Sequence, residues 1–333
     1  MMTLGNLLGG LASFVLLISV ARARKDPSTT PLNEWPMIMA HDAATTYLHP
    51  GLVNNWAKTQ ADGGAKGILD CGGRGFDWRP KLLANGTLVM HHAAVTVEHA
   101  MGAALDEMVG WAAQHNPDGS ADDLVVIGIT DCDGGAACTA AAQKELSARN
   151  ITYVTDCAEL KGLTAAAAAK KGALPGGGAL LATFDCWVMN YEPRVACSGF
   201  GTKAAADLDS PDSVSYSCYN TSKTKAFPLD RMWQYLANVS TAGPPQNGEL
   251  YTAQALWQET DASVVLGELA GSSLLGDESR AQLNAQLAAR IAGGQWDASR
   301  LNFVEVNNVC DGGPGLLAAL RTIGDDDGRD ASR

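Results

Sequence analysis

The chain has 333 residues, enough for one large domain or two ordinary ones, and 46% of them are hydrophobic, so a sizeable core is available. Only 18% are charged, and the net charge of −12 argues against nucleic-acid binding, which needs a basic surface, and against strong attraction to an anionic membrane. It leaves room for an anionic substrate that is held by a local arginine or a metal ion.

The N-terminal residues 1–23 are predicted to be a secretory signal peptide. Leu4–Val20 is apolar or small and carries no charge, and Ala21-Arg22-Ala23 has the small-x-small pattern of a cleavage site. The alternative is an uncleaved signal anchor, since the segment is close to the lower length limit for a membrane span. Its three glycines favour cleavage, and we expect a secreted protein or one in the lumen or at the surface of the secretory pathway.

Cysteines and glycosylation sequons agree with export. The chain has eight cysteines, none in a C-x-x-C pair, which argues against a zinc ribbon or a thioredoxin-like site. We predict Cys132–Cys138 and Cys197–Cys218 as disulfides because each pair flanks a loop-like stretch. The N-x-[ST] sequons are at Asn85, Asn150, Asn220 and Asn238.

Short apolar runs alternate with helix-like segments along residues 24–323. The runs are nearly continuous, which is typical of parallel strands buried on both faces. The predicted strands are Met37–Ala40, Gly67–Leu69, Thr87–Met90, Leu124–Thr130, Ile151–Val154, Ala179–Phe184, Tyr251–Trp257 and Leu301–Val306. The predicted helices are Val97–His115, Ala136–Arg149, Leu163–Lys171, Asp230–Ala237, Glu278–Ala292, Gly315–Ile323 and, more weakly, Asn54–Gly64.

This alternation favours an α/β fold, a single TIM-type (β/α)8 barrel that is either regular or distorted. Glu192–Pro228 would be an insertion after the sixth strand that contains a disulfide, and residues 324–333 a disordered acidic tail. A doubly wound open sheet is the alternative, but no G-x-G-x-x-G follows the first strand.

Polar side chains follow most of the apolar runs at the point where each run ends. In a TIM barrel the carboxyl ends of the strands meet at one mouth, where active sites lie. The side chains expected there are His41, Asp42, Asp70, His91, His92, Asp131, Asp185 and, near the end of the last run, Asn307. His91 would point to the opposite side of its strand from His92, so we interpret it as structural.

Two histidines at one mouth suggest paired general acid and base catalysis by His41 and His92. Asp42 or Asp70 would fix the imidazole tautomers, and Arg74 or Arg79 would stabilise an anionic transition state. The residues predicted to bind substrate are Arg79, Asp185, Trp187 and Trp257.

Residues 36–95 resemble the catalytic motifs of phosphatidylinositol-specific phospholipase C and its relatives. Met39–Thr45 is similar to the first motif, a strand that ends in His followed by Asp or Asn. Leu69–Arg74 and Asn85–His92 are similar to the second, in which a strand with an acidic residue is followed by a short hairpin and a strand ending in the second His. The order and the spacing of the two histidines match.

The resemblance implies that His41 is the general base on a substrate hydroxyl or on water and that His92 is the general acid. Asp42 and Asp70 would orient and polarise them, and Arg74 would substitute for the arginine of the family. Asp131 matches an acidic residue that supports the site or binds calcium, so Asp70 and Asp131 would be the ligands if the enzyme uses Ca²⁺ or Mg²⁺.

Three positions depart from the family pattern. Bacterial relatives carry an Arg two residues after the acidic residue, where this chain has Gly72, and a Gly after the second His, where it has Ala93. The acidic pair of calcium-dependent members is incomplete, with Ile68 and Asp70 in its place.

The predicted function is hydrolysis of a phosphodiester, small or in a lipid head group, with transient contact with a membrane surface allowed. One alternative is a metal-dependent glycerophosphodiester phosphodiesterase, but its His-Arg-Gly and Glu-x-Asp motifs do not occur at these positions. The other is a catalytically weakened barrel that acts as a secreted binding module, which Gly72 and Ala93 would favour. The sequence carries no signal for oligomerisation.

Overall fold

The computed structural model describes residues 25–188, 229–245, 247–256, 271 and 273–322. The predicted signal peptide, the insertion at 192–228, Trp257 and the acidic tail lie outside these residues.

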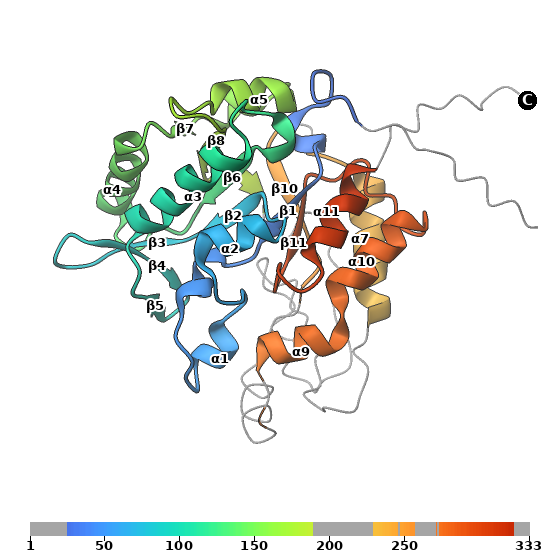
Figure 1. The fold of residues 1–333 in the computed structure, drawn as a ribbon, viewed down its shortest axis with the longest axis horizontal. Helices are drawn as coiled ribbons and strands as arrows, with labels where there is room; N and C mark the ends of the chain where they lie inside the picture. The colour runs from blue at the N-terminus through green and yellow to red at the C-terminus, as the bar shows by residue number, and fades with distance from the viewer. Residues whose placement is uncertain (1–24, 189–228, 246, 257–270, 272, 323–333) are drawn as a thin grey trace, which may run out of the picture.

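Eight parallel strands form one curled sheet in the order β7-β8-β6-β2-β1-β11-β10-β9 (Figure 1). Their bounds are β1 Met37–Ala40, β2 Gly75–Trp78, β6 Val125–Ile129, β7 Thr152–Val154, β8 Leu180–Phe184, β9 Trp187–Val188, β10 Leu250–Gln254 and β11 Phe303–Val306. All neighbouring strands pair in parallel. The predicted (β/α)8-type fold is confirmed, in a distorted form in which no described pairing joins β7 to β9.

Helices cover the outer face of this sheet (Figure 1). Their bounds are α1 Asn54–Ala57, α2 Gly64–Asp70, α3 Met101–His115, α4 Gly135–Ala148, α5 Ala165–Lys171, α7 Leu229–Ala242, α9 Leu274–Ala281, α10 Leu283–Ala292 and α11 Gly313–Arg321. The predicted helix over Glu278–Ala292 is divided into α9 and α10 at Gln282, whose φ of 50° interrupts helical geometry. The weakly predicted helix at Asn54–Gly64 extends only to Ala57.

The buried strand residues divide between two hydrophobic clusters, which explains the continuous apolar runs. Ile38 and Ala40 of β1 pack outward against the helices. Met37 and Met39 belong to the cluster inside the barrel, together with Phe303 of β11. Successive strand residues point to opposite faces, so a strand buried on both faces loses the alternation of polar and apolar residues.

Two of the predicted strands are wrong as barrel strands. Gly67–Leu69 lies in helix α2, because a short apolar run does not by itself distinguish a strand from a buried helix. Thr87–Met90 overlaps β4 (Leu88–His92), the middle strand of a separate antiparallel sheet with β3 (Pro80–Leu82) and β5 (Val95–Val97). The barrel's own second strand is β2, whose buried Asp77 breaks the apolar pattern.

Several polar residues that follow strands have a left-handed backbone. Asp42, Asp131, Asp185 and Asn308 follow β1, β6, β8 and β11 with φ values of 41°, 46°, 52° and 46°. Asp and Asn tolerate this conformation better than other residues with a side chain. Strand-end acids therefore arise here in part from a backbone requirement, so their position alone does not identify them as catalytic.

Three disulfides link the described residues: Cys71–Cys310, Cys132–Cys138 and Cys157–Cys186. The prediction of Cys132–Cys138 is confirmed, and Cys197–Cys218 lies outside the described residues. Among the sequons, Asn85 and Asn150 are exposed. No helix in the described part of the chain is both long and apolar enough to cross a membrane.

The departure at Ala93 gives a test of backbone strain. Ala93 adopts a φ of 49°, a region that glycine occupies without steric cost. We expect Ala93→Gly to raise the free energy of unfolding by about 0.5–1 kcal/mol in urea denaturation. Ala94→Gly is the matched control, because Ala94 has no positive φ, and it should lower stability or leave it unchanged. A destabilised Ala93→Gly variant would contradict the assigned conformation.

Candidate active site

His41 and Asp42 follow β1 and are almost completely buried, with 1% and 3% of their surface exposed. The His41 N–H donates to the carbonyl of Val306, which continues the pairing of β1 with β11 beyond the strands. The left-handed turn at Asp42 places its carboxylate beside the ring of His41, with 3.1 Å between Asp42 Oδ2 and His41 Nε2. The turn thus directs an acid to the imidazole that precedes it in sequence.

His92 reaches the same carboxylate from the end of β4. Its Nε2 lies 3.2 Å from Asp42 Oδ2, and its Nδ1–H donates to the carbonyl of Ala57 in α1 at 2.9 Å. The ring centroids of His41 and His92 are 6.3 Å apart. Both Nε2 atoms therefore converge on one oxygen of Asp42.

Arg79 completes the centre from the end of β2. Its guanidinium lies 2.8 Å from Asp77 Oδ2 and 3.2 Å from Asp42 Oδ1. Burial alone would lower the pKa of Arg79, but Asp77 and Asp42 outweigh this effect and raise the pKa. Burial would likewise raise the pKa of Asp42, but Arg79 and the two imidazoles lower it below its usual range. The arginine and Asp42 therefore both stay charged.

Glu305 of β11 lies inside the barrel beneath this centre and is completely buried. Gln254 donates to its Oε2 at 2.8 Å. Burial, reinforced by the negative charges of Asp77 and Asp42, raises the pKa of Glu305 to about 8, so this carboxyl group is mainly protonated at neutral pH. Glu305 therefore adds little negative charge to the centre at neutral pH.

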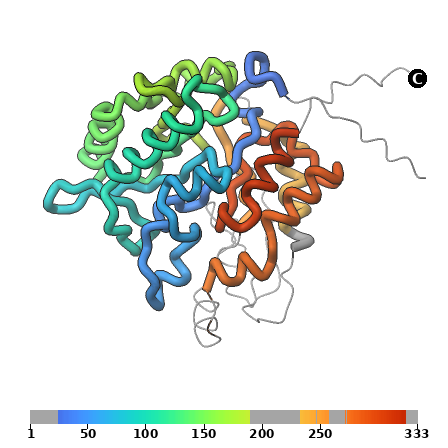
Figure 2. Tube along the Cα trace, in the orientation of Figure 1, coloured from blue at the N-terminus to red at the C-terminus, as the bar shows by residue number. Residues whose placement is uncertain are grey.

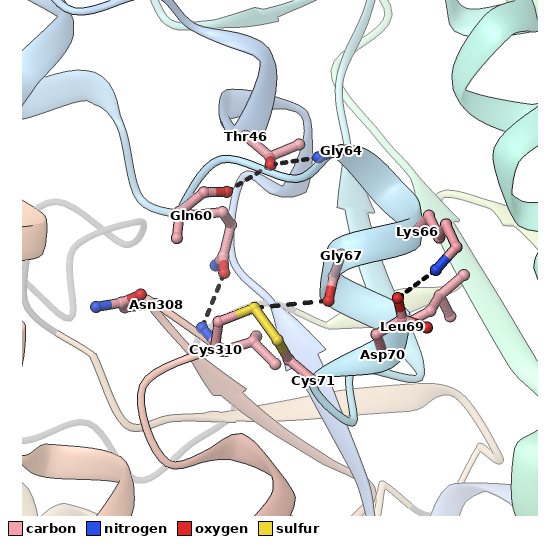
Figure 3. Close-up of a disulfide and its surroundings, with 12 residues drawn as sticks. Thr46, Gln60, Gly64, Lys66, Gly67, Leu69, Asp70, Cys71, Asn308 and Cys310 are labelled. Carbon is pink, nitrogen blue, oxygen red and sulfur yellow. Dashed lines mark hydrogen bonds and ion pairs between the residues drawn. A yellow bond between two sulfur atoms is a disulfide. The ribbon is translucent and has the colours of Figure 1, made fainter.

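The side chain of Gln60 connects the end of β1 to the end of β11 behind His41. Its amide donates to the carbonyls of both His41 and Val306 at 3.0 Å, and its oxygen accepts a main-chain N–H of the loop after β11. The disulfide Cys71–Cys310 ties the same loop to the end of α2 (Figure 3). These links fix the loop that carries Asn307.

One group of described side chains has the spacing of metal ligands: atoms of His41, Asp77 and Glu305 lie within 4.8 Å of one another. The group does not fit Ca²⁺ or Mg²⁺, which need several free oxygen ligands. Asp77 already accepts hydrogen bonds from Arg79, His41 Nδ1 is hydrogen-bonded to Asn307, and Glu305 Oε2 accepts a hydrogen bond from Gln254. Arg79 supplies the positive charge that a cation would otherwise bring.

Two residues predicted to be catalytic lie elsewhere. Asp70 ends helix α2, where it bonds Lys66 and the indole N–H of Trp111. Arg74 precedes β2, so it lies at the amino end of the sheet, opposite to His41, and its guanidinium bonds Asp123 at 2.7 Å. Both errors follow from placing the second strand too early in the sequence.

The remaining predicted residues have structural surroundings. The side chain of Asp131 is 70% exposed, and its carbonyl accepts a hydrogen bond from His91 Nε2, in agreement with a structural His91. Asp185 is exposed. Trp187 is buried in the barrel, where its indole occupies the space that a side chain at Gly128 would fill. The Ca²⁺ or Mg²⁺ site at Asp70 and Asp131 stays a prediction without support from this geometry.

Comparison with known proteins identifies the fold. The sequence matches no protein-family model and no curated protein sequence. The structure is similar to phosphatidylinositol-specific phospholipase C from Staphylococcus aureus, with 15% identity and a TM-score of 0.53 over 89% of this chain and 95% of that chain. A pentafluoro-Phe form of that enzyme has a TM-score of 0.55 at 15% identity over 90% of this chain and 95% of that chain.

The enzyme of the same kind from Listeria monocytogenes has a TM-score of 0.52 at 11% identity, over 87% of this chain and 94% of that chain. The chain has a phospholipase C-type fold. At this level of identity the likeness shows the fold alone, and the chemistry has to be argued from the residues.

The position of β2 changes the interpretation of the second motif. An acidic residue followed two positions later by Arg occurs at Asp77 in β2 and Arg79 just after it. Gly72 lies in the turn after α2, outside this centre. Asp77 was not among the predicted site residues, and this acid-x-Arg spacing is the signal in the sequence that points to it.

The raised pKa of Glu305 predicts an unusual pH dependence of stability. The folded state holds the proton more tightly than the unfolded chain, whose glutamate has a pKa near 4.5. This stabilisation is fully present below that value and is lost as the pH rises through about 8. In urea unfolding between pH 5 and pH 8, the free energy of unfolding of wild type should fall by more than about 1 kcal/mol relative to that of Glu305→Gln. The exposed Glu98→Gln is the control, and parallel pH curves for wild type and Glu305→Gln would refute the assignment.

Proposed function

We propose that the protein is a secreted phosphodiesterase of the phospholipase C type that works by general acid and base catalysis. The observation that supports this most strongly is the pair of imidazoles, His41 and His92, on one buried carboxylate next to Arg79. Their centroid separation of 6.3 Å is comparable to the width of a phosphate group.

His41 is the proposed general base. Burial, partly offset by Asp42 and Asp77, lowers the pKa of His41, so the ring is neutral at neutral pH and can accept a proton. The accepting atom is Nε2, and Asp42 Oδ2 lies 3.1 Å away to stabilise the imidazolium that forms. The nucleophile that loses its proton is a substrate hydroxyl or a water molecule.

His92 is the proposed general acid. Its Nδ1–H donates to the Ala57 carbonyl, which leaves Nε2, 3.2 Å from Asp42 Oδ2, as the atom that gives up a proton, and its side chain is 21% exposed, so a substrate oxygen can reach it. As the nucleophile forms a new P–O bond, the bond from phosphorus to the leaving oxygen breaks. His92 then gives its Nε2 proton to that oxygen, and the proton from the nucleophile is held by His41.

Arg79 is the proposed electrostatic stabiliser. Its side chain is 17% exposed, so part of the guanidinium faces the mouth while the rest is held by Asp77 and Asp42. A fixed cation stabilises the negative charge that develops on the phosphoryl oxygens without having to reorient. Because it occupies the place of a cation, we propose that the reaction needs no metal ion.

A lipid phosphodiester is the proposed substrate class. Leu52 and Val53 are the large apolar side chains that the described surface exposes most, at 71% and 64%. They directly precede α1, whose Ala57 carbonyl holds His92. An apolar tip beside the catalytic mouth would enter the acyl boundary of a membrane and bring a head group to the histidines. The overall charge of −12 favours this apolar contact over electrostatic attraction.

The rival interpretations have less support. Gly72 and Ala93 favoured a catalytically weakened binding module, but Gly72 is outside the site and Ala93 adopts the left-handed conformation that a glycine would have. A metal-dependent glycerophosphodiester phosphodiesterase would need a ligand set that this centre does not offer.

Replacing either histidine should strongly reduce catalysis. We expect His41→Ala and His92→Ala each to lower kcat by about 10²–10⁴ in hydrolysis of phosphatidylinositol, because each removes one proton transfer. The exposed His49→Ala is the matched control and should retain activity. Chelator should leave the wild-type rate unchanged. Full activity in both histidine variants would exclude the two-histidine mechanism, and loss of activity in chelator would exclude a metal-free one.

Replacing the apolar tip should separate membrane contact from chemistry. Leu52→Ser with Val53→Ser removes apolar surface without touching the histidines, so binding to phosphatidylcholine vesicles in co-sedimentation should weaken. Hydrolysis of a phosphodiester with short soluble chains should not change. Unaltered vesicle binding would contradict a membrane role for this tip.

A further inference from the structure

Asn307 and Glu278 connect His41 to helix α9 through two buried hydrogen bonds. Asn307 follows β11 and is 1% exposed, and its Oδ1 lies 2.9 Å from His41 Nδ1. Its Nδ2 donates to Glu278 Oε1 at 2.9 Å, and Glu278 is 4% exposed. The three side chains thus form one chain from α9 to the imidazole.

The chemistry of these groups decides where the protons lie. The NH₂ side of the Asn307 amide donates to Glu278 Oε1, so the amide oxygen is on the opposite side. The amide oxygen must then face His41, and because this oxygen only accepts, His41 Nδ1 must carry a proton. In the neutral ring the lone pair is therefore on Nε2, the atom beside Asp42.

The main chain around Asn307 is held in place independently of this relay. Asn284 of α10 donates its side-chain N–H groups to the carbonyls of Asn307 and Asn308, both at 3.1 Å. The disulfide Cys71–Cys310 links the same loop to α2 (Figure 3). With the backbone fixed, the orientation of the Asn307 amide is decided by its two partners, Glu278 and His41.

From this geometry we infer that Glu278 and Asn307 are positioning residues that hold His41 in the Nδ1–H tautomer and so leave Nε2 free to act as the base. This inference rests on the proposed function, because it assigns the atom of His41 that accepts the proton. Glu278 is linked to His41 through Asn307, and Asn307 bonds Nδ1, the ring nitrogen away from Asp42.

A neutral amide in contact with the ring has a specific consequence. A carboxylate at this position would stabilise the imidazolium and make His41 a stronger base that is protonated at higher pH. The amide fixes the ring without adding a charge, and Glu278 orients the amide from a distance. The ionisable groups that face His41 directly are Asp42, Asp77, Arg79, His92 and Glu305.

The tautomer can be measured without any assay of activity. We expect ¹⁵N NMR of histidine-labelled wild type at neutral pH to show His41 protonated at Nδ1. In Asn307→Ala and Glu278→Ala the signal should shift towards a mixture of tautomers. Asn308→Gly is the matched control, because it loses a bond to Ser279 of α9 and keeps the left-handed backbone, and its His41 tautomer should not change. A proton on Nε2 in wild type would overturn the inference even if no variant folds.

An exchange of charge between the two positions tests the relay in catalysis. Asn307→Asp alone removes the amide N–H that bonds Glu278 and sets two buried carboxyl groups against each other, so kcat should fall by about 10-fold or more. Adding Glu278→Gln restores a donor to the new carboxylate, so the double variant should recover most of the activity. In the pH–rate profile of the double variant, the acid limb should lie at higher pH than in wild type. The reason is that a carboxylate now faces His41 Nδ1 and raises the pKa of His41.

The two kinds of failure are distinguishable. If NMR shows the expected tautomers while wild type hydrolyses no phosphodiester, the relay stands and the proposed function fails. If wild type is active but Asn307→Ala and Glu278→Ala keep both the Nδ1–H tautomer and the wild-type pH profile, the relay is refuted. A double variant no more active than Asn307→Asp would also refute it.

Discussion

The carboxylate of Asp42 is the constraint on which the centre depends. A buried carboxylate is costly unless it is paired, and Asp42 is paired with Arg79 on one oxygen and with His41 and His92 on the other. Arg79 follows β2, His41 follows β1, and His92 ends β4. The carboxylate of Asp42 therefore links the barrel to the separate antiparallel sheet. Removing the charge would leave Arg79 partly uncompensated and the two rings without a shared anchor.

The site is built from both ends of the described chain. β1 pairs with β11 at the centre of the sheet, and in Figure 2 the blue and red parts of the tube lie side by side. Gln60 and the disulfide Cys71–Cys310 reinforce this contact at the level of the loops. Helix α9 packs against α1, so the elements that hold Glu278 and the His92 partner Ala57 also support each other.

The distribution of charge in the centre makes acid and base chemistry compatible at one pH. Asp42 and Asp77 share Arg79, while Glu305 is neutralised by burial in place of a second cation. His41 is 1% exposed and burial lowers its pKa, whereas the side chain of His92 is 21% exposed. Two identical side chains thus acquire opposite roles from their surroundings.

The fold class could be predicted from the sequence because strands buried on both faces leave continuous apolar runs. The structure also brings His41, His92, Asp42 and Arg79 together, since polar residues after such strands meet at one mouth. Their catalytic roles stay predictions. Sequence reasoning failed at Gly67–Leu69, where three apolar residues do not distinguish a helix from a strand, and this error carried Asp70 and Arg74 into the predicted site.

What the sequence by itself determined is local: the alternation of elements, the strand-end histidines and the disulfide Cys132–Cys138. Only the tertiary structure decided that Arg79 rather than Arg74 lies beside Asp42, that burial raises the pKa of Glu305, and that Glu278 is linked to His41 through Asn307. The physical reason is that pairing and burial depend on which strands and loops become neighbours in space. Sequence spacing does not encode that information for residues so far apart along the chain.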